Sequence, residues 1–255
     1  MKAILGLVAI CAALTGCDKA TKEEAKASAP PDYVATAPFS GYKTVADFEK
    51  QDAAERKENV FYRKMIRGSE EKGGVAITID HDLDPIKTPQ LLKKLEGVGL
   101  FATIFVTGQQ AEKHPDLVKK LFQAGHLVGN RSYHNVNMAK LDRGTAHAEW
   151  LKAKQAVAKA TGDEAKFARP PGGAYTDPSI LGAMKAGLVT VLWSDDFRKG
   201  ARPDRVRSGS VILLDDSSLD QLDVLAKRLK GQFRFITVYD MDVERMTAPM
   251  RGGLQ

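Results

Sequence analysis

Residues Val75–Asp84 read VAITIDHDLD, a short apolar and β-branched run followed at once by acidic and imidazole side chains. Such a run is typical of a buried strand. Pro89–Glu96 (PQLLKKLE) then places its leucines on one helical face, and Ala102–Val106 (ATIFV) is a second strand. A strand, a helix and a strand in this order indicate parallel pairing with a crossover helix. The stretch therefore predicts an α/β fold.

The same alternation continues along the chain. The strands are apolar along nearly their whole length, which indicates that both faces of the sheet are covered. So many units in one long span predict a closed or nearly closed (β/α) barrel, with its chemistry at the ends of the strands. Further helices are expected over Pro115–Gln123, Thr145–Ala160, Asp177–Ala186 and Leu219–Leu229, and strands over His126–Val128, Leu188–Leu192, Val211–Leu214 and Phe233–Tyr239.

The composition excludes several classes of protein. Hydrophobic residues make up 43% and charged residues 27% of the 255 residues, which excludes wholesale disorder and a polytopic membrane protein. The 2 cysteines, Cys11 and Cys17, exclude a disulfide scaffold and a cysteine-rich zinc site. The formal charge of +6 is diffuse, and no basic cluster interleaves with aromatic residues, so no nucleic-acid partner is expected.

The first 17 residues have the pattern of an export signal. Lys2 is followed by an apolar run, Ile4–Leu14, that is too short to span a bilayer. Leu14–Cys17 (LTGC) resembles the cleavage box of bacterial lipoproteins, in which the cysteine is lipidated. We therefore expect a lipid anchor at Cys17, and with it a membrane partner and a location in the bacterial cell envelope, on the periplasmic side. A plain secretory signal is the alternative.

The rest of the chain divides into three segments. Residues 18–42 are rich in Ala, Lys, Glu, Ser and Pro and predict a flexible tether. Residues 43–74 predict a helical extension, because Thr44–Arg67 intersperses aromatic and apolar residues with charges and Gly73 follows. Residues 75–255 form the predicted barrel domain.

Polar residues gather where the predicted strands end. Such clusters favour a functional site at one end of the barrel, although capping of helices and turns is the simpler alternative. The five clusters are Asp80–Pro85, Gly129–Asn135, Arg169–Gly173, Trp193–Asp196 and Asp215–Asp216.

Five segments together resemble the polysaccharide deacetylase family (NodB-homology domain), over about residues 75–240. The resemblance implies a distorted (β/α) barrel that removes acetyl groups from glycans such as chitin-like chains or peptidoglycan. It also implies a divalent metal, usually zinc, held by one aspartate and two histidines, with a second aspartate as base and a histidine as acid. The segments are Ala76–Gly108, Gly125–Met138, Ala168–Tyr175, Val191–Asp196 and Gly209–Asp216.

The ligand positions implied by the family are changed. Asp80 matches the base, but His81 stands where the metal-binding aspartate is expected, and Arg131 and Asn135 stand where the two histidines are expected. Arginine presents no lone pair to a cation, and an amide oxygen suits zinc poorly. No metal is therefore expected at these positions, and no cofactor elsewhere.

Other implied site residues are partly kept. Arg169 is retained, and Asp196 matches the aspartate that holds this arginine in the family. Asp215 stands in place of the acid histidine, and Gly172 in place of a tyrosine whose backbone amide forms an oxyanion hole. Asp80, Arg169, Asp196 and Asp215 are thus the candidate catalytic residues. Tyr133, Gly172 and Trp193 are candidates for substrate binding, since aromatic rings can stack on sugars.

Three hypotheses follow. In the first, metal catalysis is lost, Arg131 fills the space of the metal and pairs with Asp80 or Asp215, and the lipoprotein binds glycan or acts as an accessory protein. In the second, an active deacetylase binds zinc at a relocated site built from His81, Asp82, His134 and Asp215. In the third, the barrel is purely structural and binds no sugar.

Overall fold

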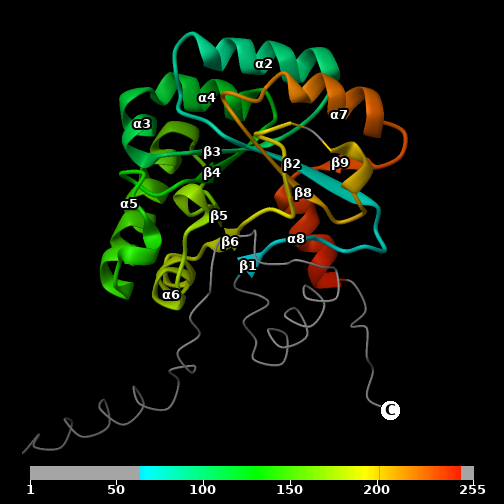
Figure 1. The fold of residues 1–255 in the computed structure, drawn as a ribbon. Helices are drawn as coiled ribbons and strands as arrows, with labels where there is room; N and C mark the ends of the chain where they lie inside the picture. Colours follow the sequence, from blue (N-terminus) through cyan, green and yellow to red (C-terminus); the bar gives the residue numbers. More distant parts are fainter. Residues whose placement is uncertain (1–63, 201, 248–255) are drawn as a thin grey trace, which may run out of the picture. The chain divides into compact units, whose positions relative to one another are not determined.

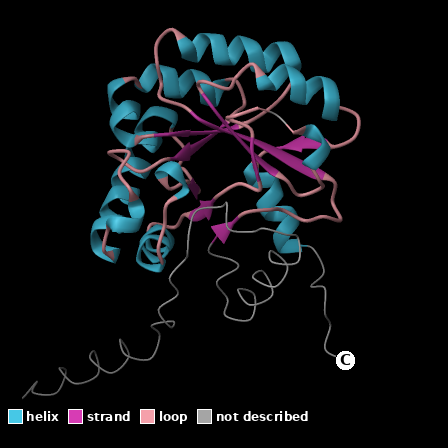
Figure 2. Ribbon diagram, in the orientation of Figure 1, coloured by secondary structure: helices cyan, strands magenta, loops and turns pink. Residues whose placement is uncertain are grey.

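A curled parallel β-sheet forms the centre of the protein. The computed structural model describes residues 64–200 and 202–247. Figure 1 shows the strands at the centre and the helices around them, and Figure 2 shows the same two layers by element type. The expected signal peptide, the lipidation site Cys17 and the tether lie outside the described residues. The predicted α/β class is confirmed.

All pairings between the named strands of the described part are parallel. The order across the sheet is β1-β6-β5-β4-β3-β2-β8-β7, and β9 also pairs with β2. The strands are β1 (Lys64–Met65), β2 (Gly74–Asp80), β3 (Thr103–Val106), β4 (Leu127–Asn130), β5 (Phe167–Ala168), β6 (Val189–Val191), β7 (Asp195–Asp196), β8 (Val211–Asp215) and β9 (Arg234–Ile236).

Within the described residues the sheet curls but does not close as a continuous ladder. Its path has β1 at one edge and β7 at the other. Backbone bonds still link the chain after β1 to the chain before β8: Arg67 and Ser210 form an isolated antiparallel bridge, and Gly68 N–H donates to the carbonyl of Gly209 at 2.8 Å. The expected barrel is thus present as a curled half-barrel.

Helices follow most of the strands. None of the helices in the described part of the chain is long and apolar enough to cross a membrane. Local signals set several helix ends: Asp142 caps α5 by accepting from the N–H groups of Gly144 and Thr145, and Pro115 opens α4. The helices are α2 (Lys87–Val98), α3 (Gly108–Lys113), α4 (Pro115–Gln123), α5 (Arg143–Thr161), α6 (Asp177–Lys185), α7 (Gln221–Leu229) and α8 (Val238–Thr247).

The start of the domain differs from the expectation. A helix was expected over Thr44–Arg67, but within it Lys64–Met65 form strand β1, which pairs with β6. Both residues are buried, so the sheet begins before the expected boundary at residue 75. The remainder of the expected helix, up to residue 63, lies outside the described residues.

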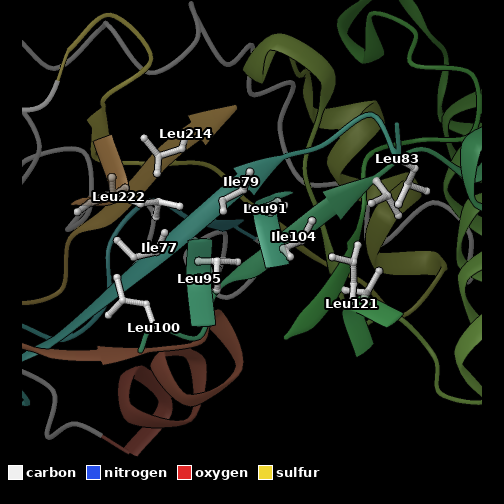
Figure 3. Close-up of a cluster of buried hydrophobic side chains, with 14 of the residues drawn as sticks. Ile77, Ile79, Leu83, Leu91, Leu95, Leu100, Ile104, Leu121, Leu214 and Leu222 are labelled. Carbon is white, nitrogen blue, oxygen red and sulfur yellow. The ribbon is translucent and has the colours of Figure 1, made fainter. Parts of the chain in front are cut away.

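The two faces of β2 and β8 pack against different partners. Alternate residues of a strand point to opposite faces. The side chains on one face, which we call the outer set, pack against α2 and α7. Figure 3 labels Ile77, Ile79 and Leu214 of this set, together with Leu91, Leu95 and Leu222 of the two helices. The side chains on the opposite face, which we call the inner set, include Ala76, Val211 and Leu213. They belong to a second cluster that also contains Phe105 and Trp193. By this alternation Asp80 and Asp215 continue the inner set.

Candidate functional site

Asp80 and Asp215 lie side by side at the carboxyl ends of β2 and β8. The two residues are register partners, and Phe105 of β3 is the partner of Asp80 on the other side. Since in-register residues of neighbouring strands point the same way, the three side chains share the inner face. We define the strand-end cluster as Asp80, His81, Asp82, Arg131, Arg169, Asp215 and Asp216.

Arg169 is a completely buried member of this cluster. Its Nη1 donates to Asp80 Oδ1 at 3.3 Å, and its Nε and Nη2 donate to the carbonyl oxygens of Val191 and Leu192 at 3.3 and 2.9 Å. The guanidinium carbon is 4.2 Å from the centre of the Phe105 ring. Burial lowers the pKa of Arg169 to about 10, and the charge of Asp80 opposes that shift. Arg169 therefore remains a cation that fixes Asp80.

Arg131 forms an ion pair with Asp82. Nη2 of Arg131 donates to Asp82 Oδ1; the Arg131 side chain is 10% exposed, whereas that of Asp82 is 68% exposed. The expected partners of Arg131 were Asp80 or Asp215, and this expectation is wrong. The reason is that Asp82 lies beyond the end of β2, where a long side chain can reach it, whereas Asp80 is taken by Arg169.

His81 is fully buried, and both of its ring nitrogens are occupied. Nδ1 contacts Asp216 Oδ1, and Nε2 contacts Thr88 Oγ1 at 2.8 Å. The Thr88 hydroxyl also lies within hydrogen-bond distance of the carbonyl oxygen of Asp84, at 2.7 Å. Both ring nitrogens of His81 are therefore engaged, Nδ1 by a carboxylate and Nε2 by a hydroxyl.

Asp216 accepts from His81 and also from the backbone N–H of Asp82, at 3.1 Å. Burial raises the pKa of Asp216, but the hydrogen bond and charge of His81 and the bond from the Asp82 N–H outweigh it, so the net pKa is lowered. The carboxylate form of Asp216 is thus part of the folded structure.

Asp196 pairs with Arg198 rather than with Arg169. Arg198 Nε and Nη2 donate to the two carboxylate oxygens of Asp196 at 2.9 and 2.6 Å. Burial raises the pKa of Asp196, but the hydrogen bonds and charge of Arg198 reverse the shift and lower it. The expected contact between Asp196 and Arg169 is wrong, because Arg169 uses Asp80 and two backbone carbonyls instead.

The loop after β4 is held by α5. Glu149 Oε2 accepts from the N–H groups of Tyr133 and His134 at 3.1 and 3.0 Å, and Oε1 contacts His134 Nδ1 at 2.6 Å. Ser132 and Asn135 have positive φ angles of 60° and 61°. These are strained for residues other than glycine, so the carboxylate of Glu149 stabilises an unusual backbone path.

The candidate sugar-binding aromatic residues are largely covered. Tyr133 is 7% exposed and donates its hydroxyl to Glu112 at 2.6 Å, and the centre of its ring lies 3.7 Å from Lys152 Nζ. Trp193 is 2% exposed and leaves little ring surface for a sugar. Gly172, by contrast, is exposed, with a φ of 64°. Of the three candidates, Gly172 alone is freely accessible.

The residues at the family's ligand positions do not fit a zinc ion. His81 has no free lone pair, Arg131 is a cation, and Asn135 is an exposed amide on a strained backbone. The alternative ligand His134 points its Nδ1 to Glu149. In the described residues no group of three His, Cys, Asp or Glu side chains is placed to hold a metal.

Four partners in this site were missed in the sequence: Asp82 for Arg131, Asp216 for His81, Glu149 for His134 and Arg198 for Asp196. Arg198 carried a signal, because a basic residue two positions after an aspartate can fold back on it. Asp216 and Glu149 act across 135 and 15 residues of chain, and no local pattern reveals such pairings.

Comparison with known proteins identifies the family of this chain. A family model described as polysaccharide deacetylase matches residues 67–191. A peptidoglycan-N-acetylglucosamine deacetylase of Bacillus cereus is 31% identical over 198 residues, which cover 71% of this chain and 72% of the relative. This chain belongs to the polysaccharide deacetylase family, as the five sequence segments predicted.

Two solved structures resemble it. A peptidoglycan N-acetylglucosamine deacetylase bound to a benzamide compound is 30% identical, with a TM-score of 0.66 over 74% of this chain and 95% of the other. A mutant of a pseudoenzyme of carbohydrate esterase family 4, with restored enzymatic activity, is 25% identical, with a TM-score of 0.65 over 71% of each chain. The wild-type pseudoenzyme comes from Bacillus anthracis. The family thus contains both active enzymes and pseudoenzymes.

Proposed function

We propose that this chain is an exported envelope lipoprotein, anchored through Cys17, whose deacetylase-like domain binds acetylated glycan or peptidoglycan without metal-dependent hydrolysis. The observation that carries the proposal is the ion pair between Arg131 and Asp82, beyond the carboxyl ends of β4 and β2. A guanidinium at a ligand position repels a divalent cation and offers it no lone pair. The protein then serves as a binding or accessory component on the periplasmic side of the membrane.

A second observation supports the loss of the metal. His81, at another ligand position, has both ring nitrogens in contact with side-chain oxygens, of Thr88 and of Asp216. To bind zinc, His81 would have to break one of these buried contacts. One ligand position therefore carries a guanidinium, and a second carries an imidazole whose two nitrogens are both occupied.

The glycan part of the proposal rests on the relatives and on the site position. Curated relatives are a peptidoglycan-N-acetylglucosamine deacetylase of Bacillus cereus and a chitooligosaccharide deacetylase of Sinorhizobium fredii. Ligands of parallel α/β folds bind at the carboxyl ends of the strands. The strand-end cluster and the exposed Gly172 follow such ends.

An active deacetylase with an atypical metal site is the second candidate. It is favoured by the retained contact between Asp80 and Arg169, which keeps a carboxylate at the position of the family's base. In that case zinc or another divalent metal would need ligands that rearrange from the contacts described above.

An acetate-release assay on N-acetylglucosamine oligomers, combined with a binding measurement on the same oligomers, tests the proposal with the full chain in detergent. We expect binding without acetate release, with or without added zinc. Zinc-dependent acetate release would establish the second candidate. Neither binding nor release would favour a purely structural lipoprotein and overturn the glycan-binding proposal.

A further inference from the structure

The loop between β7 and β8 carries a dense run of basic side chains. Residues 197–210 join the two strands, and the structure describes all of them except residue 201. One acid, Asp204, lies among these residues. We define the basic surface as the four exposed cations of the loop: Lys199, Arg202, Arg205 and Arg207.

Two buried apolar residues hold this loop against the domain. Phe197 at its start and Val206 near its end are each 2% exposed, and both belong to the core cluster that contains Ile212 of β8. The short turn η5 (Pro203–Arg205) packs against α7. Because the apolar side chains of the loop point into the core, its long charged side chains are left outside. The basic surface is therefore held in place by the packing of the domain.

Acidic side chains border the basic surface but do not neutralise it. Asp196 accepts from both Nε and Nη2 of Arg198, although Lys199 also interacts with its charge. Asp204 is one exposed acid among four cations. The surface ends at the turn that Ser208 contacts, since the two residues after Ser69 are the exposed acids Glu70 and Glu71.

The arginines of the basic surface keep their charge in contact with solvent. Arg207 Nη1 donates to the carbonyl oxygens of Asp204 and Val206 at 2.7 and 2.9 Å, which are neutral acceptors. In the described part of the chain no hydrogen bond or ion pair engages the side chains of Arg202 and Arg205. Three exposed guanidinium groups therefore lie close together in the sequence, with one acid among them.

We propose that the basic surface docks the domain on an anionic lipid bilayer, with its guanidinium groups bonded to lipid phosphates. This inference rests on the proposed function, in which Cys17 anchors the chain, and it adds a face by which the domain meets the membrane. A guanidinium binds a phosphate through two parallel N–H donors, and each basic side chain near an anionic leaflet strengthens binding.

The exposure of the cations favours a bilayer over a single bound anion. All four side chains of the basic surface are open to solvent, so they suit a plane of many phosphates better than one enclosed ligand. Residues 18–63 join Cys17 to β1, and a chain of limited length keeps the headgroups at a high local concentration around the domain. A few cations are then sufficient to hold the domain against the bilayer.

Energy transfer from tryptophan to a dansyl-labelled lipid tests the proposal, with the full chain reconstituted in lipid nanodiscs. Both tryptophans of the chain, Trp150 and Trp193, lie in the described domain. Discs of phosphatidylcholine alone are compared with discs that contain about one third phosphatidylglycerol. We expect about twofold or more transfer in the anionic discs. The excess should disappear at about 1 M salt, where charges are screened within about 3 Å.

Arg202→Gln combined with Arg205→Gln removes two charges and keeps polar side chains. We expect it to shift the docking equilibrium about tenfold or more towards the undocked domain, so that transfer in the anionic discs falls to the level of the neutral discs. Lys119→Gln combined with Lys120→Gln is the matched control. It removes two exposed positive charges from α4, which packs against α3 and α5, and should leave the transfer unchanged.

Equal transfer in the two kinds of disc for the wild-type chain would overturn the docking surface while the proposed function stands. If soluble polyphosphate then bound to the basic surface, its partner would be a soluble anion. An equal loss in the α4 variant would mean diffuse attraction of a basic protein and would also overturn the surface. A chain that inserts into neither kind of disc has no lipid anchor, and then the proposed function fails as well. An unchanged melting temperature shows that the arginine variant is folded.

Discussion

At the scale of single residues, the site is defined by which charges are paired. Arg131 stands at a ligand position of its family and pairs with Asp82, while His81 pairs with Asp216. Residue types alone predicted that Arg131 could not bind a cation. They did not predict its partner, because Asp80, Asp82 and Asp215 all follow neighbouring strand ends and only side-chain packing chooses among them.

Replacement of Arg131 tests its structural part. We expect Arg131→Ala to lower the free energy of unfolding by about 2 kcal/mol, because the buried aliphatic part of the side chain leaves a gap. The freed Asp82 adds little to the loss, since it is mostly exposed to water. Urea denaturation provides the measurement, with the exposed Lys119→Ala as control, expected within about 0.5 kcal/mol of wild type. Equal stabilities for the two variants would contradict this role.

Acid sensitivity follows from Asp216. Its pKa is lower in the folded protein than in the unfolded chain, so in acid the unfolded state binds more protons. The stabilisation is complete above the ordinary aspartate value of about 3.9 and is lost as the pH falls through the lower folded value. In Asp216→Asn this contribution is absent.

Urea denaturation of both proteins between about pH 7 and pH 3 measures the effect. We expect wild type to be the more stable at neutral pH and the difference to shrink in acid. A difference that stayed constant over this range would mean that Asp216 does not titrate through its contact with His81.

At the scale of elements, turns and helix ends decide where side chains go. The repeated strand and helix pattern predicted α4 at Pro115–Gln123 to the residue. It missed α8, because the run Phe233–Tyr239 looks like one strand. The missed signal is the pair Thr237 and Asp240, whose side chains accept from each other's N–H groups at 3.3 and 3.2 Å, as in a capping box. Such pairs override a local β preference.

The turn after β5 offers a matched pair of glycines. Gly172 and Gly173 both have positive φ angles, of 64° and 74°, but a Cβ on Gly173 would lie 2.5 Å from Trp193 and one on Gly172 would meet nothing. We expect Gly172→Ala to cost about 1–2 kcal/mol of stability from backbone strain. Gly173→Ala should cost a further 1–3 kcal/mol, on the order of an overpacked core. Thermal unfolding measures both, and equal losses would show that Trp193 yields freely.

At the scale of the whole molecule, two features could be predicted from the sequence: the curled parallel sheet, and the gathering of polar residues at the carboxyl ends of its strands. The strand alternation and the five segments carried both. The open ladder between β1 and β7 could not be predicted, because Lys64–Met65 are too short a strand for any periodicity. The covering of Tyr133 and Trp193 is likewise set by elements distant in sequence. Fold and location of the site are thus local in origin, whereas its charge pairing is not.

Zinc titration calorimetry of the full chain at neutral pH is the most direct measurement of whether the residues at the ligand positions still bind a metal. We expect no saturable binding, because Arg131 places a guanidinium at one ligand position and both ring nitrogens of His81 are occupied at another. Tight binding of one zinc ion per chain, abolished by replacement of His81, would contradict the proposal that this family member works without metal.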